Sequence, residues 1–158
     1  MTNTVLAKLW RLLRGRSPWY VLWLLHAKFI FGVSGVVLND DGQVLLLRHR
    51  FWSEGSWGLP GGYIKRRETL QDALRREVRE ETGYLIEPLA LLQLVSGYRL
   101  RLEATFLARL SGGALKLDPR EVLEARFFAP DALPDGLLRS HRALIAFARE
   151  MESPRGNM

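Results

Sequence analysis

The sequence predicts an α/β domain in which short strands surround one central helix and a second helix follows near the C-terminus. Three observations support this prediction. Apolar runs of strand length, bounded by turn residues, occur on both sides of residues 69–83. Between them, apolar residues recur at helical spacing. The chain has 158 residues, of which 47% are hydrophobic and 25% charged, as expected for one globular domain with a full core.

The first two predicted strands form a hairpin. Residues 31–38 are an apolar run, and residues 39–42 (Asn-Asp-Asp-Gly) are typical of a turn between two strands. Residues 44–48 then return as a second apolar strand. A glycine-rich loop over residues 51–68 follows, and it leads into the central helix.

The central helix has residues that define both of its ends. Thr69 is the predicted N-cap, and Asp72 stands in the capping-box position, where Glu or Gln is usual. Gly83 is predicted to end the helix in a left-handed conformation. The residues expected on the buried side are Leu70, Ala73, Leu74 and Val78.

Further strands and a last helix follow. Pro88 is expected to separate the central helix from an apolar stretch that reaches Val95. Residues 100–110 alternate as a strand does, residues 111–113 (Ser-Gly-Gly) indicate a turn, and residues 125–129 form another strand. The last helix is predicted over residues 140–151, with a buried side made of Leu144, Ile145, Phe147 and Ala148.

The chain divides into an extension at residues 1–28, a domain at residues 29–152 and a tail at residues 153–158 that we expect to be disordered. Residues 1–31 contain five Lys and Arg and no acid, so they carry five of the six excess positive charges. Apolar residues line one side of a predicted helix there. Such a helix either packs on the domain or on a second subunit in a homodimer, lies on an anionic membrane surface, or belongs to an export signal without a cleavage site.

Composition excludes several kinds of chemistry. The chain has no cysteine, which excludes disulfides, thiolate catalysis and cysteine-based zinc sites. Its three histidines are scattered without metal-ligand spacing. Outside the extension the charge is nearly balanced, so long nucleic acid is not an expected partner. Nothing in the composition requires secretion, and we expect a cytoplasmic protein.

Three acids of the central helix share one face. Glu77, Glu80 and Glu81 are three and four residues apart, so they project from a narrow arc where like charges repel. A cluster of oxygen ligands suits a hard divalent cation, above all Mg²⁺ or Mn²⁺. The alternative for such a cluster standing alone is a solvated helix face.

The residues around this cluster match a known signature. Gly62 is followed after five residues by Glu68, and after seven more by Arg76-Glu77; then come Val78, Glu80-Glu81 and Gly83. This arrangement resembles the Nudix box, and residues 57–62 (Trp-Gly-Leu-Pro-Gly-Gly) resemble the lead-in to it. One position departs from the family, since Tyr84 stands where an aliphatic residue is usual.

The resemblance implies an α/β/α sandwich with a mixed sheet and a hydrolase that cleaves a phosphoric anhydride with a divalent metal. It assigns Glu80 and Glu81 as metal ligands, and Glu77 as either a ligand or the general base. Arg76 is implied to orient the acids, and its partners are predicted to be Glu80 or Glu68. Relatives also use a further acid before a late strand. That acid is predicted to be Glu121, with Glu103 and Glu124 as alternatives, and a glycine carbonyl such as that of Gly61 could join the metal ligands.

Substrate contacts are less strongly indicated. We predict that Arg48, Arg50, Tyr98 and Arg99 bind the substrate, because guanidinium groups match phosphate and an aromatic ring stacks on a base. Arg101, Phe51 and Trp52 are further candidates for the same contacts. The alternatives are surface arginines and aromatic residues used for packing.

The predicted function is hydrolysis of the diphosphate linkage in a small nucleoside diphosphate derivative of the ADP-ribose or nucleotide-sugar type. A second reading is a pyrophosphohydrolase of nucleoside triphosphates or RNA 5′ ends. A third is a nucleotide-binding sensor without catalysis, although such modules typically lose the acids that this chain retains.

Overall fold

The computed structural model describes residues 23–26, 28–97 and 100–152. The chain forms two compact units, residues 1–30 and 31–158. Most of the predicted extension and the predicted disordered tail lie outside the described residues, so both remain predictions. No helix in the described ranges is long and apolar enough to cross a membrane.

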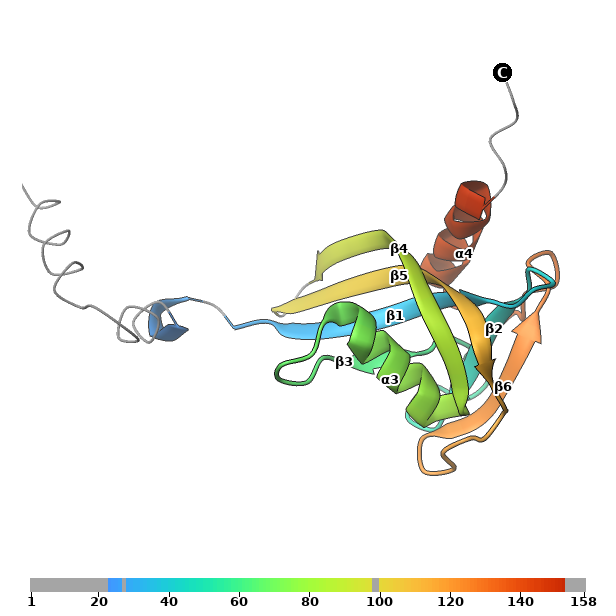
Figure 1. Cartoon of the computed structure of the whole chain (residues 1–158), viewed down its shortest axis with the longest axis horizontal. Helices are drawn as coiled ribbons and strands as arrows, with labels where there is room; N and C mark the ends of the chain where they lie inside the picture. The colour runs from blue at the N-terminus through green and yellow to red at the C-terminus, as the bar shows by residue number, and fades with distance from the viewer. Residues whose placement is uncertain (1–22, 27, 98–99, 153–158) are drawn as a thin grey trace, which may run out of the picture. The chain divides into compact units, whose positions relative to one another are not determined.

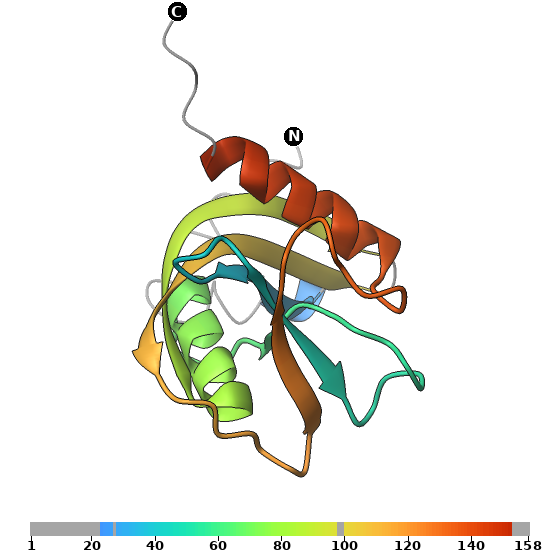
Figure 2. The ribbon, with the colours of Figure 1, turned by 90° about the vertical axis from the view of Figure 1, so that its right-hand side faces the viewer.

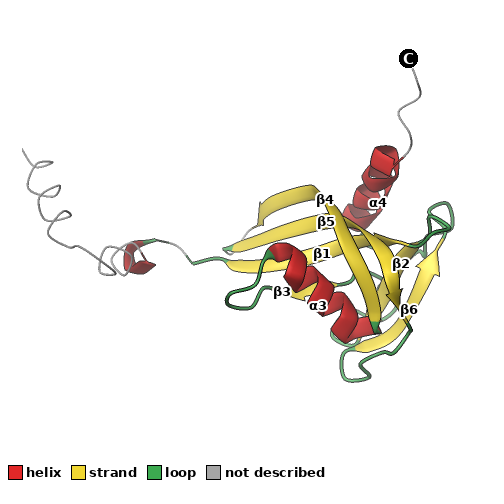
Figure 3. Cartoon of the chain, viewed as in Figure 1, coloured by secondary structure: helices red, strands yellow, loops and turns green. Residues whose placement is uncertain are grey.

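One six-stranded mixed sheet organises the second unit, as Figures 1 and 3 show. Its strands are β1 (Ile30–Leu38), β2 (Val44–His49), β3 (Gly61–Tyr63), β4 (Tyr84–Gly97), β5 (Arg101–Gly113) and β6 (Val122–Phe128). The order is β4-β5-β1-β2-β6, and β3 pairs with β1 through Gly32, Val33 and Ser34. The predicted hairpin of β1 and β2 is confirmed, with Leu38 opposite Val44.

Two helices cover opposite faces of the sheet, which confirms the α/β/α architecture (Figure 2). The helix α3 (Leu70–Thr82) packs on Val33, Val37, Leu45 and Leu47. The helix α4 (Arg139–Glu152) packs on the alternate residues Val36, Leu38, Val44 and Leu46. Because successive side chains of a strand point to opposite faces, β1 and β2 supply a core to each helix.

The ends of α3 are as the sequence predicts. Thr69 caps the N-terminus by accepting a hydrogen bond from the Asp72 backbone N–H. Gly83 ends the helix at a φ of 76°, and its N–H donates to the Arg79 carbonyl oxygen. Ala73, Leu74 and Val78 are fully buried, while Leu70 is half-buried at the edge of the same core.

Strand β4 and the C-terminal end of β5 differ from the predictions. Pro88 does not precede the strand; it lies inside β4, next to a register shift, on the outer strand of the sheet where a missing N–H is tolerated. Gly112 and Gly113 do not form a turn, because they pair with Leu85 and Tyr84. A Cβ at Gly113 would lie 2.4 Å from the Gly83 carbonyl oxygen, so glycine there allows close backbone approach.

Three smaller corrections concern the loop, the last strand and the last helix. The predicted loop at residues 51–68 contains the short strand β3, and β6 begins three residues before the predicted start at residue 125. The buried residues of α4 are Leu144, Ile145 and Ala148, whereas Phe147 is 46% exposed.

Candidate active site

A buried carboxylate lies at the centre of the candidate site. Glu81 is only 4% exposed, and it accepts a hydrogen bond from the Gly61 backbone N–H, with 3.1 Å between Gly61 N and Glu81 Oε2. Burial raises the pKa of Glu81 to about 8, and the nearby charges of Glu77, Glu121 and Glu80 act in the same direction. The other three acids predicted as metal ligands are therefore close enough to Glu81 to affect its ionisation.

Arg76 connects the acids of the box. Its Nη1 donates to Glu77 Oε1 at 2.6 Å and to Glu80 Oε2 at 3.2 Å. Its Nε and Nη2 donate to the two carboxylate oxygens of Glu68 at 3.0 and 2.7 Å, and Nη2 also donates to the Tyr63 carbonyl oxygen. Both predicted partners, Glu80 and Glu68, are therefore confirmed. A guanidinium group suits this task because its planar fork serves several oxygens at once.

The ion pair with Glu68 predicts a pH effect on stability. The Arg76 hydrogen bond lowers the pKa of Glu68 from its ordinary 4.5 to about 2, despite partial desolvation. A lowered folded-state pKa contributes stability above pH 4.5, and this contribution is lost as the pH falls through about 2. We expect the unfolding free energy of the native chain to fall more steeply between pH 4.5 and 2 than that of Glu68→Gln. Urea unfolding at several pH values measures this, and equal slopes would contradict it.

Two adjacent glycines allow β3 to approach the acids. Gly61 has a φ of 154°, and a Cβ there would lie 2.1 Å from the Val33 carbonyl oxygen. At Gly62 a Cβ would lie 2.4 Å from the carboxylate carbon of Glu77. Glycine at position 61 thus allows β3 to approach β1 closely, and glycine at position 62 allows the backbone to approach the Glu77 carboxylate.

Gly62→Ala tests this close contact. The added methyl group must displace the Glu77 carboxylate, so we expect a fall in kcat of about ten-fold or more with the fold retained. Gly32→Ala is the matched control, because an added Cβ at this other position of the cavity wall meets nothing closer than 3.7 Å. Gly42→Ala is unsuitable, because Gly42 has a φ of 70° that strains any other residue. Steady-state kinetics and circular dichroism of Gly62→Ala and Gly32→Ala measure the difference. Equal kcat values in the two variants would show that the position of Glu77 does not matter.

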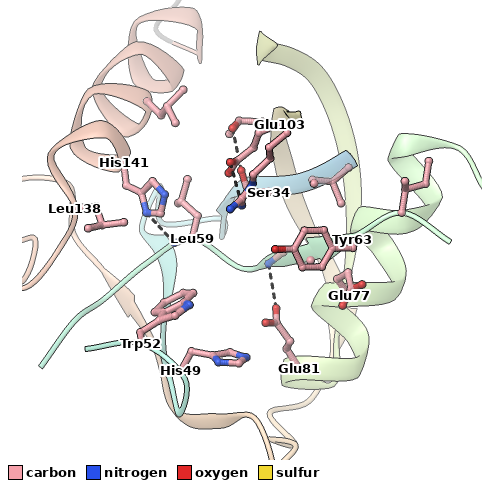
Figure 4. Close-up of a pocket in the computed structure, with 18 of the residues that line it drawn as sticks. Ser34, His49, Trp52, Leu59, Tyr63, Glu77, Glu81, Glu103, Leu138 and His141 are labelled. Carbon is pink, nitrogen blue, oxygen red and sulfur yellow. Dashed lines mark hydrogen bonds and ion pairs between the residues drawn. The ribbon is translucent and has the colours of Figure 1, made fainter. Parts of the chain in front are cut away.

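The acids open onto a cavity of about 980 Å³ (Figure 4). Its wall includes Glu77, Glu80 and Glu81 from α3, together with Gly61 and Gly62. Figure 4 shows Glu77 and Glu81 on one side of this space, with Trp52 and His141 across from Glu77. A cavity of this volume is large enough for a nucleotide-sized ligand.

The acids outside the box divide into two groups. Glu121 lines the cavity, and its Oε2 lies 3.8 Å from His49 Nε2. The alternative Glu103 also lines the cavity, where it pairs with Arg101 at 3.2 Å. Glu124 does not line the cavity and pairs with Arg48 at 3.2 Å. The structure therefore favours Glu121 and Glu103 over Glu124 as acids that face a ligand.

The two predicted substrate-binding residues that the structure describes, Arg48 and Arg50, do not reach the cavity. Arg48 pairs with Glu124, and Arg50 donates to the Pro119 carbonyl oxygen at 2.9 Å; neither lines the cavity. Tyr98 and Arg99 lie outside the described residues. Arg101, a further candidate in the sequence, does line the cavity and stands over the Tyr63 ring.

Sequence reasoning missed several residues of the cavity wall. His49, Tyr63, Lys65 and His141 all line it, although neither histidine has a neighbour in sequence that suggests a site. One signal was available at Ser34, a polar residue within the apolar run of β1. Ser34 is buried and bonds the Thr105 hydroxyl at 2.9 Å, where the sheet forms the wall of the cavity.

Comparison with curated proteins shows clear relatives. Over 124 residues the chain is 35% identical to the 8-oxo-dGDP phosphatase NUDT18 of Mus musculus. This aligned region covers 76% of this chain and 38% of the relative. It is 31% identical over 112 residues to the NAD-capped RNA hydrolase NudC of Vibrio atlanticus, covering 70% of this chain and 42% of the relative. The chain thus matches less than half the length of these relatives.

Solved structures give the same fold. A MutT NUDIX hydrolase from Burkholderia pseudomallei superimposes with a TM-score of 0.65 at 28% identity, covering 76% of this chain and 98% of that one. A UDP-X diphosphatase superimposes with a TM-score of 0.67 at 21% identity, covering 95% and 79%. The latter similarity concerns the fold alone.

The family model for the NUDIX domain matches residues 28–148, a range that includes the sheet, α3 and its acids, and most of α4. The chain therefore belongs to the NUDIX family of hydrolases, which act on phosphoanhydride bonds.

Proposed function

We propose that this chain is a Mg²⁺- or Mn²⁺-dependent pyrophosphohydrolase that cleaves the diphosphate linkage of a small nucleoside diphosphate derivative, of the ADP-ribose or nucleotide-sugar type. The observation that carries the proposal is the buried Glu81, which lies beside Glu77, Glu80 and Glu121 in one nucleotide-sized cavity. Acids that crowd a cavity wall repel one another and lower the stability of the fold. Such a cost is typical of a functional site, and a cation bound between the acids would offset it.

The acid cluster fits the divalent metal that NUDIX hydrolases generally use. In the described part of the chain, no three His, Asp or Glu side chains converge as a ready-made metal site, and Arg76 is bonded to Glu77 and Glu80. The candidate ligand atoms are carboxylate and carbonyl oxygens, as hard cations prefer, and a cation would offset the burial and the repulsion that together raise the pKa of Glu81. The residues that would hold the ion are Gly61, Glu77, Glu80, Glu81 and Glu121.

When bound, a divalent ion would supply an activated water and neutralise charge on the diphosphate. The residues of the chain prepare the site for this. Gly61 fixes Glu81 through its N–H, and Arg76 holds Glu77 and Glu80. Glu77 is either a ligand or the general base, since it reaches the cavity with only one of its oxygens bonded to Arg76. Water adds to one phosphorus, and the bond from that phosphorus to the bridging oxygen breaks.

The names of two relatives guide the choice of substrates to test. One is an 8-oxo-dGDP phosphatase and the other an NAD-capped RNA hydrolase. Both 8-oxo-dGDP and NAD contain a diphosphate attached to a nucleoside. Long RNA is a weaker candidate here, because residues 32–158 carry only one of the six excess positive charges.

A hydrolysis panel tests the proposal. It contains ADP-ribose, nucleoside diphosphate sugars, 8-oxo-dGDP, nucleoside triphosphates, and NAD-capped and triphosphorylated RNA, each with Mg²⁺ and with EDTA. We expect one diphosphate derivative to be cleaved fastest, and Glu80→Gln to lose most of this activity because Glu80 acts through its charge. Faster cleavage of triphosphates or RNA would favour the second reading. No turnover of any compound would favour a sensor.

A further inference from the structure

One end of the cavity has no part in the chemistry described so far. The residues that line it are His49 at the end of β2, Phe51 and Trp52 from the segment after β2, and Leu138 and His141 near the start of α4. In Figure 4, Trp52 and His141 lie across the cavity from Glu77. This end, which we call the aromatic end, is defined by Trp52 and His141.

The Trp52 ring is held in place before any ligand arrives. Its six-membered ring lies against Gly58, where an added Cβ would be 2.6 Å from ring carbons Cη2 and Cζ3. The His49 ring lies 5.3 Å away at an angle of 30°, and the backbone N–H of Trp52 donates to the backbone carbonyl oxygen of His49. Trp52 is 37% exposed and lines the cavity, so its ring offers a stacking surface for a flat ligand.

His141 is held as a hydrogen-bond donor. Its Nδ1 accepts a hydrogen bond from the Leu59 backbone N–H, with 3.3 Å between the nitrogens, so Nδ1 carries no proton. A neutral imidazole then has its single proton on Nε2. Burial lowers the pKa of His141, which favours the neutral form, although the charge of Glu103 opposes this in part.

The Nε2 atom of His141 is accessible from the cavity. Within the described ranges, Nε2 has no hydrogen-bond partner. Every buried side-chain nitrogen or oxygen in those ranges does have a partner, so Nε2 is not one of the buried atoms. Nε2 is therefore not sealed inside the protein. Since His141 lines the cavity, its N–H is available to a ligand beside Trp52.

We propose that the aromatic end binds the nucleobase of the substrate, which stacks on Trp52 and accepts a hydrogen bond from His141 Nε2. The inference rests on the proposed function, because it requires the diphosphate to lie at the acids. A stacking face and one fixed donor suit a base with a ring nitrogen or carbonyl acceptor. A ribose has no aromatic π-face to stack on the indole.

Equilibrium binding tests this without any hydrolysis. Isothermal titration calorimetry of the full chain with Mg²⁺ compares AMP, GMP and UMP with ribose 5-phosphate, which has the same phosphate and sugar but no base. We expect at least one nucleotide to bind about ten-fold or more tightly than ribose 5-phosphate. Trp52→Ala should weaken the binding of that nucleotide by roughly 5- to 100-fold, the range for loss of one base-stacking contact. Trp52→Phe should retain part of the lost affinity.

His141 variants test the hydrogen bond. His141→Phe should weaken nucleotide binding by about five- to ten-fold and leave ribose 5-phosphate unchanged, whereas His141→Gln, which retains an acceptor and a donor, should bind closer to the native level. Phe147→Ala, at an exposed position of α4 that does not line the cavity, is the control for the helix. Thermal unfolding shows whether each variant folds. If His141→Phe does not fold, the comparison of the native chain with Trp52→Phe still tests the inference.

Two results would overturn the inference. One is equal binding of nucleotides and ribose 5-phosphate by the native chain. The other is an equal loss of affinity for the nucleotide and for ribose 5-phosphate in both Trp52→Ala and His141→Phe. Failure of the proposed function looks different, because base-dependent binding would then persist while the hydrolysis panel shows no turnover.

Discussion

Glu81→Gln is expected to lower kcat by at least about 100-fold while the protein still folds. The loss is in the range for removing one group that acts directly in a catalytic site. Glutamine has nearly the same shape, and its side-chain oxygen still accepts the hydrogen bond from the Gly61 N–H. Only the charge is lost, and a cation site depends on that charge.

The measurement is steady-state kinetics on the best compound of the panel, with circular dichroism to check the fold. Glu150→Gln is the matched control, since Glu150 is an exposed acid of α4 outside the cavity. We expect the control to retain the native rate. A kcat for Glu81→Gln within a few-fold of the native value would remove Glu81 from the catalytic centre.

The same variant should be more stable than the native chain in the absence of metal at high pH. The folded-state pKa of Glu81 is raised from 4.5 to about 8, so its favourable contribution is full below pH 4.5 and is lost as the pH rises through about 8. Glutamine does not ionise, and it avoids this loss. Urea unfolding in EDTA should show an advantage of Glu81→Gln that grows between pH 5 and 8.

Arg76→Met has the second largest expected effect, and it should act on stability as well as on activity. The substitution leaves the half-buried Glu68 and Glu77 without their main partner. Removing one partner from such a network costs about 2 to 4 kcal/mol of unfolding free energy. Because Glu77 and Glu80 are then free to move, kcat should fall by about ten-fold or more even where the variant is fully folded.

Arg75→Met is the control for Arg76→Met. Arg75 is the preceding residue on α3 and also forms two ion pairs, with Asp72 and Glu87, but it is only half-buried and both acids are exposed. Exposed pairs contribute less than about 1 kcal/mol. Urea unfolding compares the two variants, and Arg76→Lys shows whether the planar fork matters. Equal stability losses at positions 75 and 76 would contradict the special role of Arg76.

The elements of the fold with strong local patterns could be predicted from the sequence. Thr69 and Gly83 specify the ends of α3 through contacts a few residues away, and the apolar runs of β1 and β2 specify a hairpin. Prediction failed where partners distant in sequence decide the structure. Pro88 lies within a strand because β4 is an outer strand, and Gly113 lies in a strand because it packs on Gly83.

The same distinction applies to the site. The acids on α3 and their partner Arg76 lie on or near one helix, so their meeting follows from helical spacing. The wall across from Glu77 is built from the segment around Trp52 and from His141, and their meeting depends on how α4 packs on the sheet. Arg48 and Arg50 looked suitable by residue type, but Glu124 and the Pro119 carbonyl occupy them.

Binding of Mn²⁺ measured by electron paramagnetic resonance tests the central claim most directly, because it needs no knowledge of the substrate. The native chain, Glu81→Gln and Glu150→Gln are titrated with Mn²⁺ at pH 8. We expect the native chain and Glu150→Gln to bind Mn²⁺ with the same affinity. We expect Glu81→Gln to bind Mn²⁺ roughly ten-fold or more weakly. Equal binding by all three proteins would contradict a metal centre at Glu81.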